Sequence, residues 1–265
     1  DSPMPVLCEK SHHIMTLTLS RPEARNAWGD DYNSELPVYL DEATEDDDIR
    51  CVILTGDEAG SAFSAGANLK QEKTHNTQSA EAFIKRMAGF RKFATNSISD
   101  FPKPILCAVN GYAIGVGAIV TFCCDMIIAS DKAEWRLPQV ALGIIPNHGG
   151  ASRMARLAGR GNAMKLAMGF PLKADEAYRV GVAQWIQPHK NMMSKAMEIA
   201  DHLCELPPLA ARLTKESLNR GIDIPNQTDA AMIDLYRFMV LEQTEDKTEA
   251  HEAWREKRDP VFKGR

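Results

Sequence analysis

The sequence predicts an α/β fold with mainly parallel strand pairing. Two observations lead to this prediction: short, continuous apolar runs alternate with amphipathic helical stretches, and a mostly helical segment follows residue 190. A strand that is covered by helices on both faces of a parallel sheet carries apolar residues at every position, whereas a half-exposed strand alternates. Most of the predicted strands are continuously apolar.

The strands are predicted from their apolar runs. Residues 14–19 alternate between apolar and polar side chains, which indicates a half-buried strand. Residues 51–55, 105–109 and 126–129 are continuously apolar, as expected of strands buried on both faces. The last strand signal along the chain lies at residues 185–186.

Helices are predicted between these strands, at about residues 30–45, 78–96 and 115–124. Pro37 weakens the first of them as one unbroken helix, because proline lacks the backbone N–H and clashes with the preceding turn. Beyond residue 190 a methionine-rich apolar stripe repeats at helical spacing, which is typical of core or subunit contact rather than of a cofactor site. Further helices are expected at about 209–220 and 226–243, with no strand signal among them.

The composition excludes several classes of protein. The chain has 265 residues, of which 44% are hydrophobic and 25% charged, so global disorder is excluded. A net charge of −5 argues against nucleic acid as the main partner, and no apolar run is long enough to span a membrane. Six scattered cysteines and the lack of a signal-peptide pattern favour a reducing, cytoplasmic location, or an organellar matrix if a targeting segment has been removed.

Two glycine-rich segments, at residues 61–70 and 110–119, each follow an apolar strand. Small residues at a strand-to-helix turn allow a ligand to approach backbone N–H groups. The alternative is a plain tight turn with close helix packing. Neither segment fits the GxGxxG, GxxxxGK[ST] or GxSxG signatures, so nucleotide binding and a serine nucleophile are disfavoured.

Four motifs follow one another along the chain: the RPEARNA segment at 21–27, the SAGANLK loop at 64–70, KPILCAVNG at 103–111 and LGIIPNHGG at 142–150. In order and spacing they resemble those of the enoyl-CoA hydratase/isomerase (crotonase) superfamily, and the closing residues 256–265 are also similar. The resemblance implies a spiral of strand–strand–helix turns. It further implies a core at 1–205 and a helical oligomerisation region at 206–265, assembled as a homotrimer or a dimer of trimers.

The resemblance also implies a site that binds an acyl-CoA thioester. Two backbone N–H groups, those of Ala67 and Val116, would polarise the thioester carbonyl as an oxyanion hole. Val116 stands where the family usually has glycine, a change that keeps the backbone donor. No metal and no cofactor is expected beyond the coenzyme A of the substrate.

Binding of the CoA moiety is expected from three parts of the chain. The last residues, 253–265, hold five basic and two acidic side chains, which suits CoA phosphates, although a solvated tail would have the same composition. The candidates that the resemblance implies are Arg25, Ala65, Lys70, Phe262 and Lys263. His75, Arg86, Arg91 and Tyr236 are weaker candidates for a place at the site.

The sequence departs from the family pattern at both positions of the usual catalytic glutamates, which hold Ile119 and Gln139. Neither side chain transfers protons near neutral pH, so classical hydration is disfavoured. His148 could act as a general base on water that Gln139 orients; equally, it could cap a turn or pack under the acyl chain. The expected activity is therefore that of an atypical enoyl-CoA hydratase/isomerase-family enzyme. The alternatives are an acyl-CoA or C–C bond hydrolase and a non-catalytic acyl-CoA-binding protein.

Overall fold

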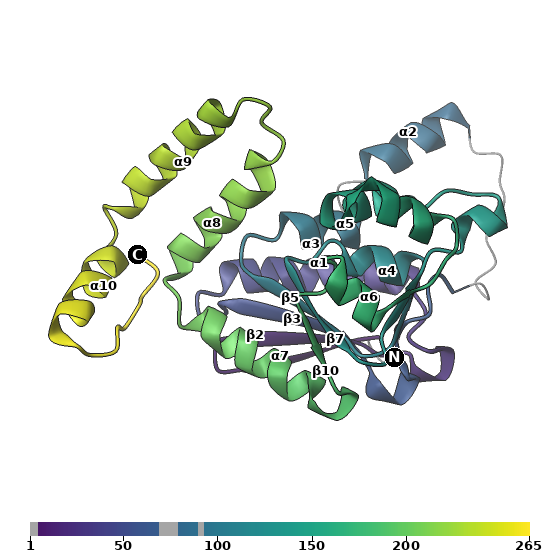
Figure 1. Ribbon diagram of the computed structural model, residues 1–265, viewed down its shortest axis with the longest axis horizontal. Helices are drawn as coiled ribbons and strands as arrows, with labels where there is room; N and C mark the ends of the chain where they lie inside the picture. Colours follow the sequence, from purple (N-terminus) through teal and green to yellow (C-terminus); the bar gives the residue numbers. More distant parts are fainter. Residues whose placement is uncertain (1–4, 69–78, 90–92) are drawn as a thin grey trace.

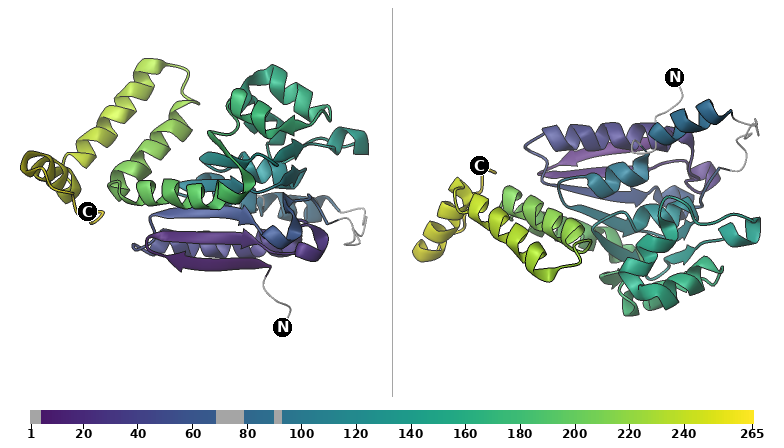
Figure 2. Two further views of the ribbon diagram at one scale, coloured as in Figure 1. Left: turned by 60° about the horizontal axis from the view of Figure 1, so that its bottom comes forward. Right: turned by 90° about the horizontal axis from the view of Figure 1, so that it is seen from above.

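The computed structural model describes residues 5–68, 79–89 and 93–265. The candidate residues Lys70, His75 and Arg91, and the side chain of Arg86, lie outside the described part. A central sheet with helices on both faces forms the body of the molecule, and a helical arm extends from one end of it (Figures 1 and 2).

The central sheet has the strand order β1-β2-β3-β5-β7-β10. These strands are Val6–Ser11, Ile14–Leu19, Cys51–Gly56, Ile105–Val109, Met126–Ser130 and Trp185–Gln187. Strand β1 pairs with β2 in an antiparallel manner, and every other neighbouring pair is parallel. The predicted apolar strands are thus confirmed, and β10 is the last strand of the described chain.

A smaller second sheet carries the glycine-rich turns. It has the order β4-β6-β8-β9, and its strands are Ala62–Ser64, Tyr112–Ile114, Glu134–Arg136 and Leu172–Lys173. Strands β4, β6 and β8 are parallel to one another. The spiral of strands and helices that the resemblance implied is present, although these very short strands were not predicted individually.

Helices cover both faces of the central sheet. On one face lie α1 (Asp30–Glu45), α3 (Ala94–Asp100) and α4 (Val116–Thr121), which bury a large apolar cluster with β2, β3 and β5. On the other face α7 (His189–Cys204) packs its buried residues against the same strands (Figure 1). The methionine-rich stripe is thus part of the core, as predicted.

Two helix predictions are wrong in detail. Helix α1 continues through Pro37, because its buried face of Tyr32, Leu36, Leu40 and Ala43 holds it against the sheet despite the missing N–H. The single helix expected at 78–96 is instead two helices, α2 (Ala80–Ala88) and α3, of which α3 alone buries apolar side chains. The remaining body helices are α5 (Gly150–Ala167) and α6 (Ala174–Arg179).

The helical arm consists of α8 (Pro208–Gly221), α9 (Gln227–Leu241) and α10 (Glu245–Glu256), followed by a C-terminal tail at residues 257–265. Helix α8 follows α7 after the break at Pro207, as predicted, whereas α10 was not predicted. Figure 2 shows α9 and α10 standing away from the sheet in both views. The division at residue 205 and an oligomerisation role for the arm stay predictions.

A partly buried ion pair joins the arm to the sheet. Lys215 of α8 lies 2.7 Å from the Asp125 carboxylate and also donates to the Lys103 carbonyl at 2.9 Å. Asp125 in turn accepts from the backbone N–H of Ile105, the first residue of β5, at 2.8 Å. Burial raises the pKa of Asp125, and the neighbouring Lys215 ammonium opposes that rise. Lys215 therefore favours the ionised form of the Asp125 carboxylate.

We expect Lys215→Met to lower the free energy of unfolding by about 3 kcal/mol, because it leaves a buried carboxylate without its counter-charge. The double variant Asp125→Asn/Lys215→Met removes both charges and should be less destabilised than the single variant. Urea unfolding of both measures this difference. A single variant as stable as the double would contradict the role of the ion pair.

Candidate active site

The two glycine-rich segments meet side by side. A Cβ built on Gly66 would lie 2.8 Å from the Ile114 carbonyl oxygen, and one built on Gly117 would lie 2.7 Å from the Ser64 carbonyl oxygen. Gly66 also has φ +88°, a conformation that other residues rarely adopt. Both glycines are therefore required for this close approach, which brings residues 64–68 next to the start of α4.

Pairing with Trp28 fixes the direction of the Ala67 amide. Trp28 and Ala67 form an isolated parallel bridge, in which Trp28 N donates to the Gly66 carbonyl at 2.7 Å and Asn68 N donates to the Trp28 carbonyl at 2.9 Å. In a parallel bridge the middle residue directs its own N–H away from the partner strand. The N–H of Ala67 thus points away from Trp28, and Ala67 is exposed.

The Val116 amide opens α4. Gly115 precedes the helix with φ +56° and donates its own N–H to the Arg136 carbonyl at 2.8 Å. The first N–H groups of a helix have no carbonyl in their own helix to bond. Val116 itself is half-buried against the main apolar cluster, so the side chain that replaces the usual glycine is accommodated.

Asn26 anchors the turn that carries Arg25. Its side-chain amide donates to the carbonyls of Asp57 and Ala62 at 2.9 and 2.8 Å, and its oxygen accepts from Arg21 N at 3.0 Å. The Arg25 carbonyl accepts from Ala65 N at 3.0 Å, so these two CoA candidates are neighbours. Asn26 was not predicted as a site residue; its position in the RPEARNA motif and the tolerance of asparagine for positive φ, here +56°, are the available signals.

The two family glutamate positions lie in different surroundings. Ile119 is fully buried on α4, where its side chain closely approaches Gly150. Gln139 opens a short 3-10 helix (Gln139–Leu142) and lies close to Gly115, with its Nε2 3.5 Å from a Cβ built there. The Gln139 side chain is 8% exposed, and its Oε1 has no hydrogen-bond partner within the described residues.

His148 is held against α3. Its Nδ1 lies 3.5 Å from Thr95 Oγ1, and its ring packs edge-on against Phe93 with centroids 5.2 Å apart. Arg153 holds the same turn by donating to the His148 carbonyl at 3.2 Å and to Ser99 Oγ at 2.6 Å. His148 is half-buried and has φ +52°, so both its side chain and its backbone are closely fixed. Arg153 and Thr95 were not predicted as neighbours of the site.

Comparison with known proteins assigns the family. The enoyl-CoA hydratase/isomerase family model matches residues 9–265. A short-chain-enoyl-CoA hydratase of Clostridium acetobutylicum is 35% identical over 255 residues, covering 96% of this chain and 95% of its own length. A crystal structure of an enoyl-CoA hydratase from Bacillus anthracis superposes with a TM-score of 0.89 at 30% identity, covering 98% of this chain and 100% of the other. The chain belongs to the enoyl-CoA hydratase/isomerase family.

Membership of this family leaves the reaction open. A relative from Escherichia coli, 32% identical over 98% of both chains, is a 1,2-epoxyphenylacetyl-CoA isomerase. Relatives at similar identity therefore carry out different reactions.

The remaining CoA candidates lie at the far end of the chain. The C-terminal tail, which contains Phe262 and Lys263, lies beside the arm, whereas α4, which begins at Val116, lies in the body on the other side of the view (Figure 1). Within one chain, the structure thus brings Arg25 and Ala65 together but separates them from the tail.

Two carboxylates of α10 hold the tail in place. Asp246 accepts from the backbone N–H groups of Lys263 and Gly264 at 2.7 and 2.8 Å. The two carboxylate oxygens of Glu249 accept hydrogen bonds from the two terminal nitrogens of Arg258, at 2.6 and 2.9 Å. Glu249 also accepts from the backbone N–H of Val261. The Arg258 guanidinium lowers the pKa of Glu249 to about 2. The tail therefore has a defined path along the arm.

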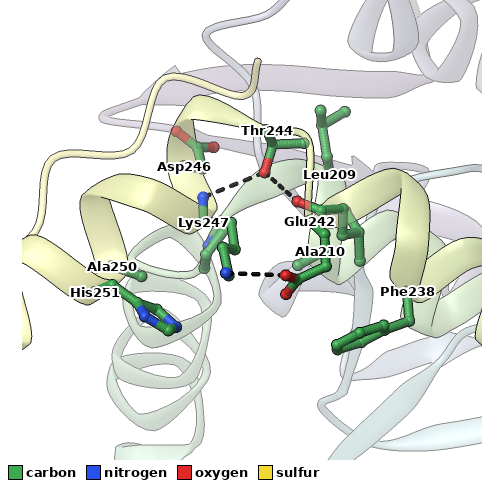
Figure 3. A pocket seen from close by; sticks show the side chains of 11 residues that line it. Leu209, Ala210, Phe238, Glu242, Thr244, Asp246, Lys247, Ala250 and His251 are labelled. Atoms are coloured by element: carbon green, nitrogen blue, oxygen red, sulfur yellow. Dashed lines mark hydrogen bonds and ion pairs between the residues drawn. The ribbon is translucent and has the colours of Figure 1, made fainter.

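An apolar groove of about 310 Å³ lies within the arm rather than beside α4. Figure 3 shows the Lys247–Glu242 ion pair, 3.0 Å long, among the side chains that line the groove, with Phe238 and His251 across from each other.

No helix among the described residues is long and apolar enough to cross a membrane. In that same part of the chain, no group of three His, Cys, Asp or Glu residues is arranged to hold a metal ion.

We expect Gly117→Ala to destabilise the protein by about 1–3 kcal/mol, because the new methyl group would force α4 away from the Ser64 carbonyl. Gly161→Ala is the matched control, since a Cβ at Gly161 meets nothing within 4 Å. Thermal unfolding of the two variants measures the difference. If the two variants were equally stable, the close contact between residues 64–68 and the start of α4 would not be required for the stability of the fold.

Proposed function

We propose that this protein acts on an acyl-CoA thioester whose carbonyl is bound by the N–H groups of Ala67 and Val116. The observation that carries this proposal is the contact between the two glycine-rich segments, supported by the family match. The Ala67 amide is directed away from Trp28 and the Val116 amide opens a helix. Two such donors would stabilise the negative charge that develops on the thioester oxygen as an enolate or tetrahedral intermediate forms.

The CoA moiety would be bound along Arg25 and Ala65, with Lys70 as a further candidate. Phe262 and Lys263 would reach such a site only from a second copy of the chain, given the distance of the tail from the loop. An oligomer of this kind is supported by the apolar side chains that α9 exposes, among them Tyr236, Phe238, Met239 and Val240. We therefore propose a homotrimer or dimer of trimers, in which the arm forms subunit contacts.

Classical hydration of an enoyl-CoA would be slow or absent in this protein. Syn hydration in the family uses two glutamates, and this chain has an aliphatic side chain and a neutral amide in their places. The Ile119 side chain is fully buried against a glycine turn, so it also leaves no room there for an ordered water. General acid–base catalysis typically contributes about 10²–10⁴-fold to a rate, which is the loss we expect.

Hydrolysis by His148 is a second candidate function, favoured by two observations. The His148 ring is closely positioned by Thr95 and Phe93, and the buried Gln139 Oε1 lacks a partner within the described residues. An unpaired buried acceptor is costly, and a water or a substrate hydroxyl would satisfy it. A non-catalytic acyl-CoA carrier is the remaining alternative.

A panel of CoA thioesters separates these functions. Incubation with enoyl-, 3-oxoacyl- and cyclic acyl-CoAs, followed by mass spectrometry, detects added water, released CoA or an unchanged substrate. Released CoA or an altered acyl group supports catalysis at the proposed site. Tight binding without any product across the panel would support the carrier function instead.

We expect the Ile119→Glu/Gln139→Glu double variant to hydrate crotonyl-CoA at least about 10²-fold faster than the wild type, because it restores both proton-transferring groups. Loss of crotonyl-CoA absorbance measures the rate. The Ile119→Gln/Gln139→Glu variant is the matched control, since it is equally polar but lacks one carboxylate. Rapid hydration by the wild type would overturn the argument from the missing glutamates.

If the panel reveals hydrolysis, we expect His148→Ala to lower kcat by about 10²-fold or more with a small change in KM, because a general base acts mainly on the chemical step. His202→Ala, which changes an exposed histidine on α7, serves as the control. Steady-state kinetics of CoA release measures both constants. An unchanged kcat/KM in His148→Ala would rule out this residue as the base.

A further inference from the structure

An apolar rim, formed by residues 140–145, is exposed on the body of the molecule. Its four large apolar side chains are between 43% and 74% exposed; they are Val140, Leu142, Ile144 and Ile145. No residue from 137 to 147 is charged, although 25% of the whole chain is. A single exposed apolar side chain is common on a protein surface, but several together usually mark a binding surface.

Both ends of the rim are attached to the candidate site. At its start, Gln139 lies against Gly115, with the Gln139 Nε2 3.5 Å from a Cβ built there. At its end, the Cβ of the buried Pro146 lies 3.1 Å from a Cβ built on Gly150, which also meets the Ile119 side chain at 2.8 Å. Gly115 precedes α4 and Ile119 lies on it. The rim therefore borders the helix that presents the Val116 amide.

The backbone holds the rim in one conformation. Gly143 N donates to the Val140 carbonyl at 3.0 Å, and Ile144 N donates to the Gln139 carbonyl at 3.1 Å. Gly143 has φ +74°, which other residues rarely adopt, and it ends the short 3-10 helix that Gln139 opens. A surface that is already ordered loses little conformational entropy when a ligand covers it. The exposed side chains are thus presented by a rigid turn.

The side chains between the rim and the proposed oxyanion hole are apolar as well. Ile119, at a position where the family usually has glutamate, is fully buried, and Val116 adds a side chain where glycine is usual. An acyl group whose carbonyl is bound by the Ala67 and Val116 amides starts beside these two side chains. Its next carbons meet the rim, because the rim is attached on both sides of this part of α4.

We propose that the acyl group of the substrate is a long apolar chain that covers the rim. The proposal rests on the proposed function and adds the class of acyl group to it. Each methylene that is fully removed from water lowers Kd about four-fold. A rim that covers one side of the chain gives part of this gain, so we expect eight additional methylenes to lower Kd at least about 10²-fold.

Titration calorimetry with two uncleavable ketone analogues tests the proposal. In S-(2-oxopentyl)-CoA and S-(2-oxotridecyl)-CoA a methylene separates sulfur from the carbonyl, and the two compounds differ by eight methylenes. Both are used below the concentration at which the longer one forms micelles. Ile144→Gln/Ile145→Gln should reduce the ratio of the two Kd values at least about ten-fold. Leu218→Gln, which changes a 71% exposed leucine on α8, is the matched control and should keep the wild-type ratio.

The outcomes separate this proposal from the proposed function. If both analogues bind to the wild type with the same Kd, the long-chain proposal is wrong and the proposed function stands. If neither binds, the proposed function fails and the long-chain proposal fails with it. An unchanged ratio in Ile144→Gln/Ile145→Gln also overturns the role of the rim. If that variant shows a lower mass by light scattering together with an unchanged ratio, the rim is a contact between copies of the chain instead.

Discussion

The hydrogen bonds of the buried Asn26 side chain are the constraint on which the candidate site depends. One amide group joins the turn that carries Arg25 to the end of β3 and to β4, through the carbonyls of Asp57 and Ala62. Because Ala65 then bonds to Arg25 and Ala67 pairs with Trp28, the direction of the Ala67 N–H follows from this anchor. A loop that presents a backbone donor needs such support, since a donor contributes to catalysis only when it is held in position beforehand.

Much of the fold could be predicted because the strands of the central sheet are buried on both faces. Strand β5 is fully buried and apolar at every position, and its predicted range is the observed one. Strands β4, β6, β8 and β9 have two or three residues each, too few to show a period. Helix α1 continues through Pro37 because its buried face packs against the sheet, and this packing cannot be read from the local sequence. The two glycine-rich segments of the candidate site could be singled out from the sequence, but the anchor at Asn26 and the contacts of His148 with Thr95 and Phe93 depend on distant parts of the chain.

The candidate site has one side formed by backbone groups and another formed by the side chains at positions 119 and 139, and the two sides differ in how far they follow the family pattern. The backbone side, formed by the 64–68 loop and the start of α4, keeps the close glycine contacts that the family motifs require. On the other side, Ile119 fills the space beside Gly150, and Gln139 has a neutral amide with an unpaired oxygen. The scaffold for binding a thioester carbonyl is thus separable from the groups that move protons. The relatives of similar identity include both a hydratase and an isomerase.

The strand order has a consequence for how copies of this protein can associate. The central sheet ends at β1 on one side and at β10 on the other, and an unpaired strand edge is a template for pairing with another chain. On β1 the charged side chains Glu9 and Lys10 lie near the edge, and Lys10 is paired with Glu42 and Asp46 of the neighbouring helix segment. Strand β10 has three residues and is followed directly by Pro188. Both edges thus discourage the addition of further strands, so growth into sheet-like aggregates is opposed.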